Sequence, residues 1–138
     1  MKWDKDLETG NTIVDDQHKE IFSLVRQVLD ADILSDRKEK TETALNFLAD
    51  YAVRHFASEE ELMTKSKYPQ YNQHKALHDN FVKKVVDFIG LYQKESDTMS
   101  VSETINNFVV VWLQEHIMVS DRAMAKFYKN WEASHNNQ

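Results

Sequence analysis

Hydrophobic side chains recur along this chain every three or four residues, which is the spacing of one face of an α-helix. Four long segments carry such a stripe, and polar residues interrupt the pattern between them. A shorter amphipathic segment follows near the C-terminus, whereas the first residues show no helical period. The pattern predicts an arm over residues 1–14, helices over about 16–34, 36–65, 69–92 and 101–119, and a C-terminal segment over 121–132.

The amino-acid composition favours an all-helical chain. Two glycines and one proline among 138 residues are too few for a fold of short strands and tight turns. The length suits one domain with a real hydrophobic core. We therefore expect an all-α, up-down-up-down four-helix bundle over residues 1–138, with an extended N-terminal arm and a short C-terminal helix.

Charge and hydropathy exclude several classes of function. A net charge of −6 without any block of lysine or arginine argues against nucleic-acid binding. The longest apolar run, Phe108 to Leu113, is too short to cross a membrane, and the first residues do not resemble a signal peptide. We expect a soluble, cytoplasmic protein with no membrane contact. The absence of cysteine restricts any metal site to imidazole and carboxylate ligands.

Histidines occupy the inward stripe of every predicted helix. His74 and His78 lie one helical turn apart, so both can bind one metal ion. His55 and Glu59 repeat that spacing, and a buried glutamate needs a positive partner such as a metal ion. The remaining candidates on the inward stripes are His18 on the first helix and His116 on the fourth.

Asp121 is a further candidate ligand, but its spacing is unusual. It follows His116 by five residues, which on a regular helix separates the two side chains by about 140°. They can share a face only if the helix ends or widens between them. The spacing therefore predicts a departure from α-helical geometry near Val119 and Ser120.

Other polar residues have simpler explanations. Glu60 and Glu61 lie off the inward stripe and are interpreted as solvated charges. Asp15 and Asp16 suit the first turn of a helix, where the helix dipole favours negative charge. A single histidine on an apolar stripe is also more often a hydrogen-bonded core residue than a ligand. The joint occurrence of five such histidines with two carboxylates is what favours a metal site.

These residues and their spacing closely resemble the hemerythrin family in its single-domain bacterial form. The similarity covers nearly the whole chain, because each predicted helix contributes one of the matching pieces. The matching pieces are DQH at 16–18, HFASEE at 55–60, HKALH at 74–78 and WLQEHI at 112–117, followed by Asp121.

The resemblance implies a non-haem centre of two iron ions with an oxo or hydroxo bridge. One iron would be held by His74, His78 and His116, and the other by His18 and His55. Glu59 and Asp121 would bridge them, so the second iron has one ligand fewer and a vacant position for dioxygen. The resemblance places an apolar pocket for O₂ at Ile21, Phe56, Trp112, Leu113 and Ile117.

By the same resemblance, the protein would bind O₂ reversibly, for O₂ carriage, storage or buffering, and would not be an enzyme. A site with few anionic ligands disfavours the high-valent iron that cleaves the O–O bond, which also points to reversible binding. Three alternatives stay open. They are an O₂ or redox sensor acting through an unknown protein partner, a di-iron peroxidase or NO-handling enzyme, and sequestration of iron or zinc.

Overall fold

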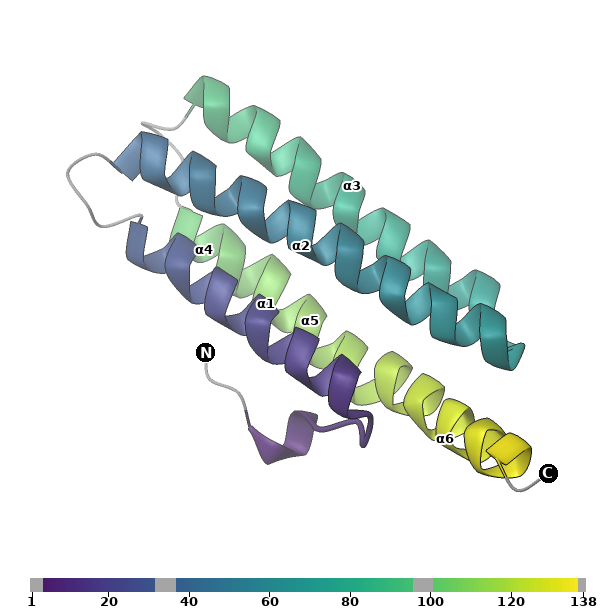
Figure 1. The fold of residues 1–138 in the computed structure, drawn as a ribbon. Coiled ribbons are helices and arrows are strands. Elements are labelled where there is room, and N and C mark those ends of the chain that lie inside the picture. The colour runs from purple at the N-terminus through teal and green to yellow at the C-terminus, as the bar shows by residue number, and fades with distance from the viewer. Residues whose placement is uncertain (1–3, 32–36, 96–100, 137–138) are drawn as a thin grey trace.

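Helices account for nearly all of the described structure. The computed structural model describes residues 4–31, 37–95 and 101–136 (Figure 1). After a short 3₁₀ turn, η1 (Lys5–Leu7), come three long helices and a fourth helical run. The long helices are α1 (Thr12–Ala31), α2 (Arg37–Ser66) and α3 (Tyr71–Glu95).

The fourth run is helical throughout but changes its hydrogen-bonding pattern along its length. Two of its segments have the wider π-helical turn, in which each N–H reaches back five residues instead of four. In chain order the run consists of α4 (Val101–Thr104), the π-segment η2 (Ile105–Val110), α5 (Val111–His116), the π-segment η3 (Ile117–Asp121) and α6 (Arg122–Asn136).

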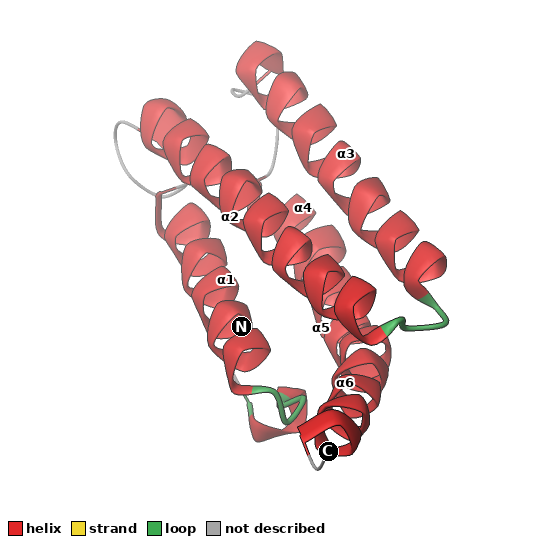
Figure 2. Ribbon diagram, turned by 45° about the vertical axis from the view of Figure 1, so that its right-hand side comes forward, coloured by secondary structure: helices red, strands yellow, loops and turns green. Residues whose placement is uncertain are grey.

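The helices pack as the predicted four-helix bundle, which confirms the expected fold class. Helix α2 packs along both α1 and α3, and its far end also contacts α6 (Figure 2). Aromatic contacts such as that of Phe81 with Trp112 join α3 to the fourth run. The core divides into a large apolar cluster that extends along the bundle and a small one, formed by Val14, Met63, Tyr68 and Met124, near the α2–α3 turn.

The N-terminal arm is shorter than predicted and is not wholly extended. Helix α1 begins at Thr12 because the Asn11 side chain caps it, accepting the Val14 N–H at 3.1 Å. Val14, assigned to the arm from the sequence, is a buried residue of the first helical turn. Leu7 in η1 is also buried, and η1 packs against η3. The arm therefore lies against the segment that carries Asp121.

A tight turn joins α2 to α3. Lys67 adopts a left-handed backbone, with φ of 57°, and its N–H binds the carbonyl of Thr64. The Tyr68 N–H binds the carbonyl of Met63, and these two hydrogen bonds together end α2 with a Schellman motif. The prediction that Pro69 starts the third helix was wrong. Pro69 lies in this turn, and α3 begins at Tyr71.

The fourth helix does not stop at residue 119 as predicted. It continues through η3 into α6 without interruption, since neither proline nor glycine occurs there and the π-turn accommodates the change in geometry. The third helix likewise extends to Glu95 rather than Tyr92. The expected helix start at Asp36 and the end of the first helix over 32–34 lie outside the described residues.

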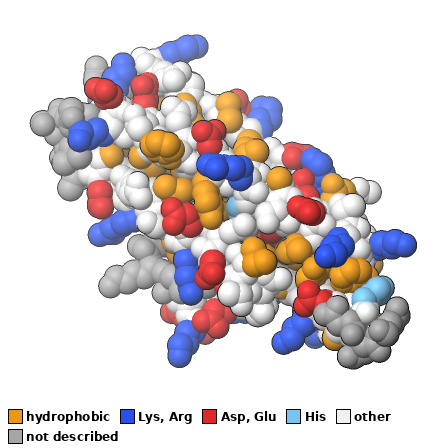
Figure 3. Space-filling model, in the orientation of Figure 1, with side chains coloured by type: hydrophobic (Ala, Val, Ile, Leu, Met, Phe, Trp, Pro, Cys, Tyr) orange, Lys and Arg blue, Asp and Glu red, His pale blue; other side chains and the backbone are white. Residues whose placement is uncertain are grey.

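The surface is mixed in character. Charged side chains are interspersed with small groups of hydrophobic ones on the face shown in Figure 3. Within the described ranges, no helix combines the length and the apolar character that crossing a membrane requires. Several of the large exposed hydrophobic residues lie on the fourth helical run, namely Val111, Met118 and Val119.

Candidate metal centre

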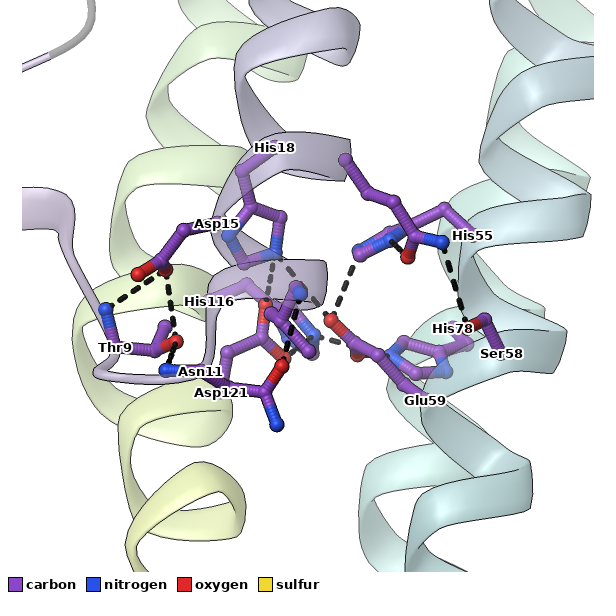
Figure 4. Close-up of polar contacts among 12 residues, drawn as sticks. Thr9, Asn11, Asp15, His18, His55, Ser58, Glu59, His78, His116 and Asp121 are labelled. Carbon is purple, nitrogen blue, oxygen red and sulfur yellow. Dashed lines mark hydrogen bonds and ion pairs between the residues drawn. The ribbon is translucent and has the colours of Figure 1, made fainter.

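Five imidazoles converge on two buried carboxylates inside the bundle (Figure 4). Glu59 and Asp121 are fully buried, and every one of the five histidines is at most 5% exposed. Helix α1 contributes one imidazole, α2 and α5 one each, and α3 two. The convergent residues are His18, His55, Glu59, His74, His78, His116 and Asp121, which are the seven expected from the sequence.

Glu59 directs its two oxygens toward different histidines. Its Oε2 lies 2.8 Å from His55 Nε2 and 3.3 Å from His18 Nε2. Its Oε1 lies 3.0 Å from His78 Nε2 and 3.3 Å from His74 Nε2. One carboxylate therefore faces two separate groups of nitrogen atoms, as a carboxylate that bridges two cations would.

Asp121 divides its oxygens in the same way. Its Oδ2 lies 2.8 Å from His18 Nε2, while its Oδ1 lies 3.0 Å from both His74 Nε2 and His116 Nε2. The two carboxylates are shared by two groups of ligand residues. Within each group, the ligand atoms all lie within 4.8 Å of one another. One group holds three imidazoles and the other two, and both include Glu59 and Asp121.

The π-turn of η3 explains how His116 and Asp121 share a face. Five residues separate them, and the i to i+5 pattern over Ile117–Asp121 brings residues at that separation one above the other. Both side chains consequently point into the bundle and approach to 3.0 Å. This confirms the predicted departure from α-helical geometry around Val119 and Ser120.

The donor atoms have the spacing expected around cations. Within the described residues, no oxygen of Glu59 or Asp121 makes a hydrogen bond of good geometry, although each lies 2.8–3.3 Å from an imidazole nitrogen. The Nε2 atoms of His78 and His116 lie 3.1 Å apart. Two ligands about 2.1 Å from an ion at right angles would lie roughly 3.0 Å apart. The residues therefore fit metal ions.

Electrostatics within the cluster show what a bound cation would replace. Burial by itself raises the pKa of Glu59, but the charge of His55 and close contacts with His18 and His74 hold it well below its usual range. Burial would lower the pKa of His18, yet Asp121 and Glu59 raise it to about 9. The same carboxylates raise the pKa of His74 to about 9 against burial. Without cations, the carboxylates hold protons on these imidazoles instead.

Two of the histidines have hydrogen-bond partners that fix which nitrogen faces the cluster. His55 Nδ1 donates to Gln17 Oε1 at 2.7 Å, and the Gln17 amide in turn donates to Ser58 Oγ. His78 Nδ1 donates to Glu60 Oε2 at 3.0 Å. With the proton on Nδ1, the Nε2 lone pair of each ring is directed at the carboxylate cluster.

Sequence reasoning missed these partners. Gln17 was part of a matching motif without a role, and Glu60 was interpreted as a solvated charge. That interpretation was wrong, because helix α3 brings the outer nitrogen of His78 to the side of α2 that carries Glu60. The available signal was the position of each residue directly beside a ligand, which is a weak signal without knowledge of the neighbouring helix.

A hydrogen-bonded turn also sets the position of the first ligand. Asp15 Oδ1 accepts from both the backbone N–H and the hydroxyl of Thr9, at 2.9 and 2.8 Å. The Thr9 hydroxyl oxygen accepts the Asn11 N–H (Figure 4). Asp15 thus stabilises the start of α1, one turn before His18, and this agrees with its assignment as a helix-start residue.

The five apolar residues assigned to an O₂ pocket do not all lie in the same surroundings. Phe56 stacks on the imidazole of His78 with ring centroids 4.0 Å apart, and Trp112 stacks on that of His116 at 4.4 Å. These two aromatic rings therefore contact the three-histidine group. Phe56 is also a buried member of the large apolar cluster, as are the remaining three residues, namely Ile21, Leu113 and Ile117.

Comparisons with known proteins agree with this site. The Hemerythrin HHE cation binding domain matches residues 9–128. A bacteriohemerythrin of Stenotrophomonas maltophilia is 32% identical over 125 residues, covering 91% of this chain and 79% of that protein. A hemerythrin-like protein of Naegleria gruberi is 32% identical over 121 residues, covering 88% of this chain and 87% of its own length.

A solved structure gives the same result. The crystal structure of a wild-type hemerythrin matches with a TM-score of 0.83 and 31% identity, covering 93% of this chain and 97% of the other. The range matched by the family model, residues 9–128, contains all seven of the convergent residues. This chain therefore belongs to the hemerythrin family.

Proposed function

We propose that this protein binds dioxygen reversibly at a non-haem di-iron centre, for O₂ carriage, storage or buffering in the cytoplasm. The observation that carries the proposal is the unequal division of the imidazoles. Three of them group on one side of the shared carboxylates Glu59 and Asp121, and two on the other. Membership of the hemerythrin family supports iron as the metal.

The residues would divide between the two ions as the two groups do. His74, His78 and His116 would hold one iron, and His18 and His55 the other, with Glu59, Asp121 and an oxo or hydroxo group shared. When bound, the pair of ferrous ions supplies two electrons and one vacant coordination position for O₂. The vacant position would lie on the side of His18 and His55, where the chain offers one imidazole fewer.

The protein surroundings suit a dry site. The carboxylates are fully buried between the large apolar cluster and the small cluster that contains Met63 and Met124. We propose that Ile21, Phe56, Trp112, Leu113 and Ile117 keep water from the O₂ position. Excluding water slows loss of electrons from a ferrous centre and strengthens electrostatic interactions within the site.

The donor set favours binding over oxidation chemistry. Two carboxylates and five neutral imidazoles supply less negative charge than the four carboxylates of ferritin-like di-iron sites. Less anionic donation stabilises ferrous relative to high-valent iron. A carrier or buffer role is therefore preferred to a peroxidase or NO-handling enzyme.

One contact favours a second candidate, an O₂ or redox sensor. The arm packs against η3, the segment that ends at Asp121, with Leu7 buried there. Arg122 additionally donates from Nε to the carbonyl of Glu8 at 3.2 Å. A change at Asp121 would therefore reach the arm directly, where a protein partner would detect it.

Reconstitution with Fe(II) without oxygen, followed by air and then vacuum, tests the proposal. We expect two irons per chain and a visible charge-transfer band that appears in air and disappears on deoxygenation. Irreversible bleaching, or steady turnover with an added reductant, would favour the enzymatic alternative. A metal content of one zinc per chain would refute the di-iron centre. An oxygen-dependent change in protease cleavage within the arm would favour the sensor.

A further inference from the structure

The candidate ligands are not covered equally by the rest of the protein. His116 is 5% exposed and His74 is 3% exposed, whereas the other five ligand residues are 1% exposed or less. Both of the less covered histidines belong to the three-histidine group. The cover over the centre is therefore thinnest on the side where α3 faces α5 and η3.

Two adjoining hollows open to the surface on that side. One has a volume of about 210 Å³ and reaches His116, and the other has a volume of about 230 Å³ and reaches His74. Leu77, Val119 and Ser120 line both hollows, so they form one groove between α3 and η3. Because water occupies about 30 Å³ per molecule, each hollow has room for an ion with its shell of about six waters.

The charge of this groove suits a cation. Glu115 is exposed at its edge, beside His116, and within the described parts of the chain neither lysine nor arginine lines the groove. The larger hollow between α2 and α3 is lined by Glu60 and Asp79 as well as Lys83, so charge alone does not distinguish it from the groove. Its inner end, however, is closed by Phe56 stacked on His78, while Glu60 occupies the outer nitrogen of that imidazole.

The wall of the groove is a segment that can open more easily than a regular helix. Val119 is 65% exposed and Leu77 is 40% exposed, so little packing holds these two side chains in place. Val119 and Ser120 belong to the π-segment η3, where the hydrogen bonding departs from that of a regular α-helix. Segments with few buried contacts are the ones that open locally at low cost.

We propose that the groove between α3 and η3 is the route by which a hydrated divalent iron ion reaches the centre. Glu115 attracts the ion to the groove, the side chains of Leu77 and Val119 move apart, and His116 and His74 replace water ligands first. The inference rests on the metal site of the proposed function but not on O₂ binding. It assigns a role to Leu77, Glu115 and Val119, to which the proposed O₂ binding gives none.

Stopped-flow mixing of the metal-free full-length protein with Co²⁺ alone tests the route, because imidazole-bound cobalt absorbs in the visible. Val119→Trp and Leu77→Trp each fill the groove and should slow loading about tenfold, since binding then requires a larger opening. Glu115→Gln should slow loading about threefold, and high salt should abolish this difference. Equilibrium stoichiometry and affinity should remain those of the wild-type protein.

Matched variants separate the route from general effects. Val111→Trp alters an exposed valine on α5 outside the groove, and Glu61→Gln removes an exposed carboxylate elsewhere, so both should load at the wild-type rate. Wild-type loading rates in both groove-filling variants would refute the route. So would a slow rate in Val53→Trp, which fills the α2–α3 hollow instead. Failure of the wild-type protein to bind metal at all would instead refute the proposed function.

Discussion

The two halves of the bundle are stabilised in different ways. Toward the ends of α1 and α3, the core consists of aliphatic and aromatic side chains such as Val28, Leu48, Val85 and Ile105. Toward the α2–α3 turn, the same four helices surround five imidazoles and two carboxylates that have almost no contact with solvent. We refer to these as the apolar half and the metal half.

The difference shows which half can fold without help. Apolar burial stabilises folding at roughly 25 cal/mol per Å², independently of any ligand. Burying Glu59 and Asp121 carries a desolvation cost that neighbouring protons or cations must offset. The apolar half should therefore hold the bundle together in the metal-free protein, while the metal half depends on the charge at its centre.

The largest effect should come from removing a shared carboxylate. Glu59→Ala deletes the oxygens that face both groups of histidines, so the paired centre should be lost while the helical circular dichroism signal persists. Metal analysis and the visible spectrum measure this. Glu61→Ala, which removes an exposed carboxylate two residues away, should leave both unchanged. A paired centre that survives Glu59→Ala would show that Glu59 is not the carboxylate shared by the two groups of histidines.

A cavity in the apolar half should have the reverse effect. Leu48 is 1% exposed, and Leu48→Ala should lower the free energy of unfolding by about 2–5 kcal/mol through lost burial and the cavity left behind. Urea denaturation followed by circular dichroism measures this loss. The number of metal ions bound per chain should not change. Loss of metal from this variant would indicate that the two halves are coupled.

The third largest effect should be a dependence of folding stability on pH, which arises in the metal half and not in the apolar half. His18 and His74 have a pKa of about 9 in the folded metal-free protein, against 6.5 for an unperturbed histidine. Their stabilisation is fully present below pH 6.5 and is lost as pH rises through 9. A single group with this shift would lose roughly 3 kcal/mol, and the two losses are not additive because both histidines share Glu59 and Asp121. Urea denaturation between these pH values measures the loss.

In the metal-free protein stability falls as pH rises, and bound metal should reverse this dependence. Because ligand imidazoles must lose their protons, the apparent metal affinity should increase over the same pH range, and acidification should release the metal. Leu48→Ala should show the same pH slope as the wild-type protein, since its effect lies in the other half. A metal-free protein whose stability is constant from pH 6.5 to 9 would contradict the ion pairs at the centre.

The smallest effect should come from the outer partners of the imidazoles. Gln17→Ala and Glu60→Ala remove the acceptors that hold the protons of His55 and His78 on Nδ1. Such changes typically lower metal affinity about tenfold to a hundredfold. Competition with a chelator measures the affinity. Glu60→Gln keeps an acceptor, so its metal affinity should lie between those of Glu60→Ala and the wild-type protein. If Glu60→Gln binds metal no more tightly than Glu60→Ala, the hydrogen bond to His78 is unimportant.

Much of this architecture could be predicted from local patterns. The stripes of hydrophobic residues specified the four helices, and the position of His55 and Glu59 on one of them indicated the centre before any fold was known. The five-residue spacing of His116 and Asp121 also predicted a departure from α-helical geometry between them, although not whether the helix would end or widen. Helix ends were less predictable, because Asn11 and Lys67 act through side-chain capping and a left-handed backbone rather than through periodicity.

The sequence by itself determined which side chains face the interior, because helical periodicity depends only on the residue order. It therefore specified the five histidines and Glu59 as candidate ligands, whereas Asp121 shares their face only because the helix departs from α geometry. Only the tertiary structure decided how Glu59 and Asp121 divide their oxygens, which partners hold His55 and His78, and where the cover over the centre is thinnest. These features join different helices, and their geometry depends on how the helices pack rather than on spacing within any one of them.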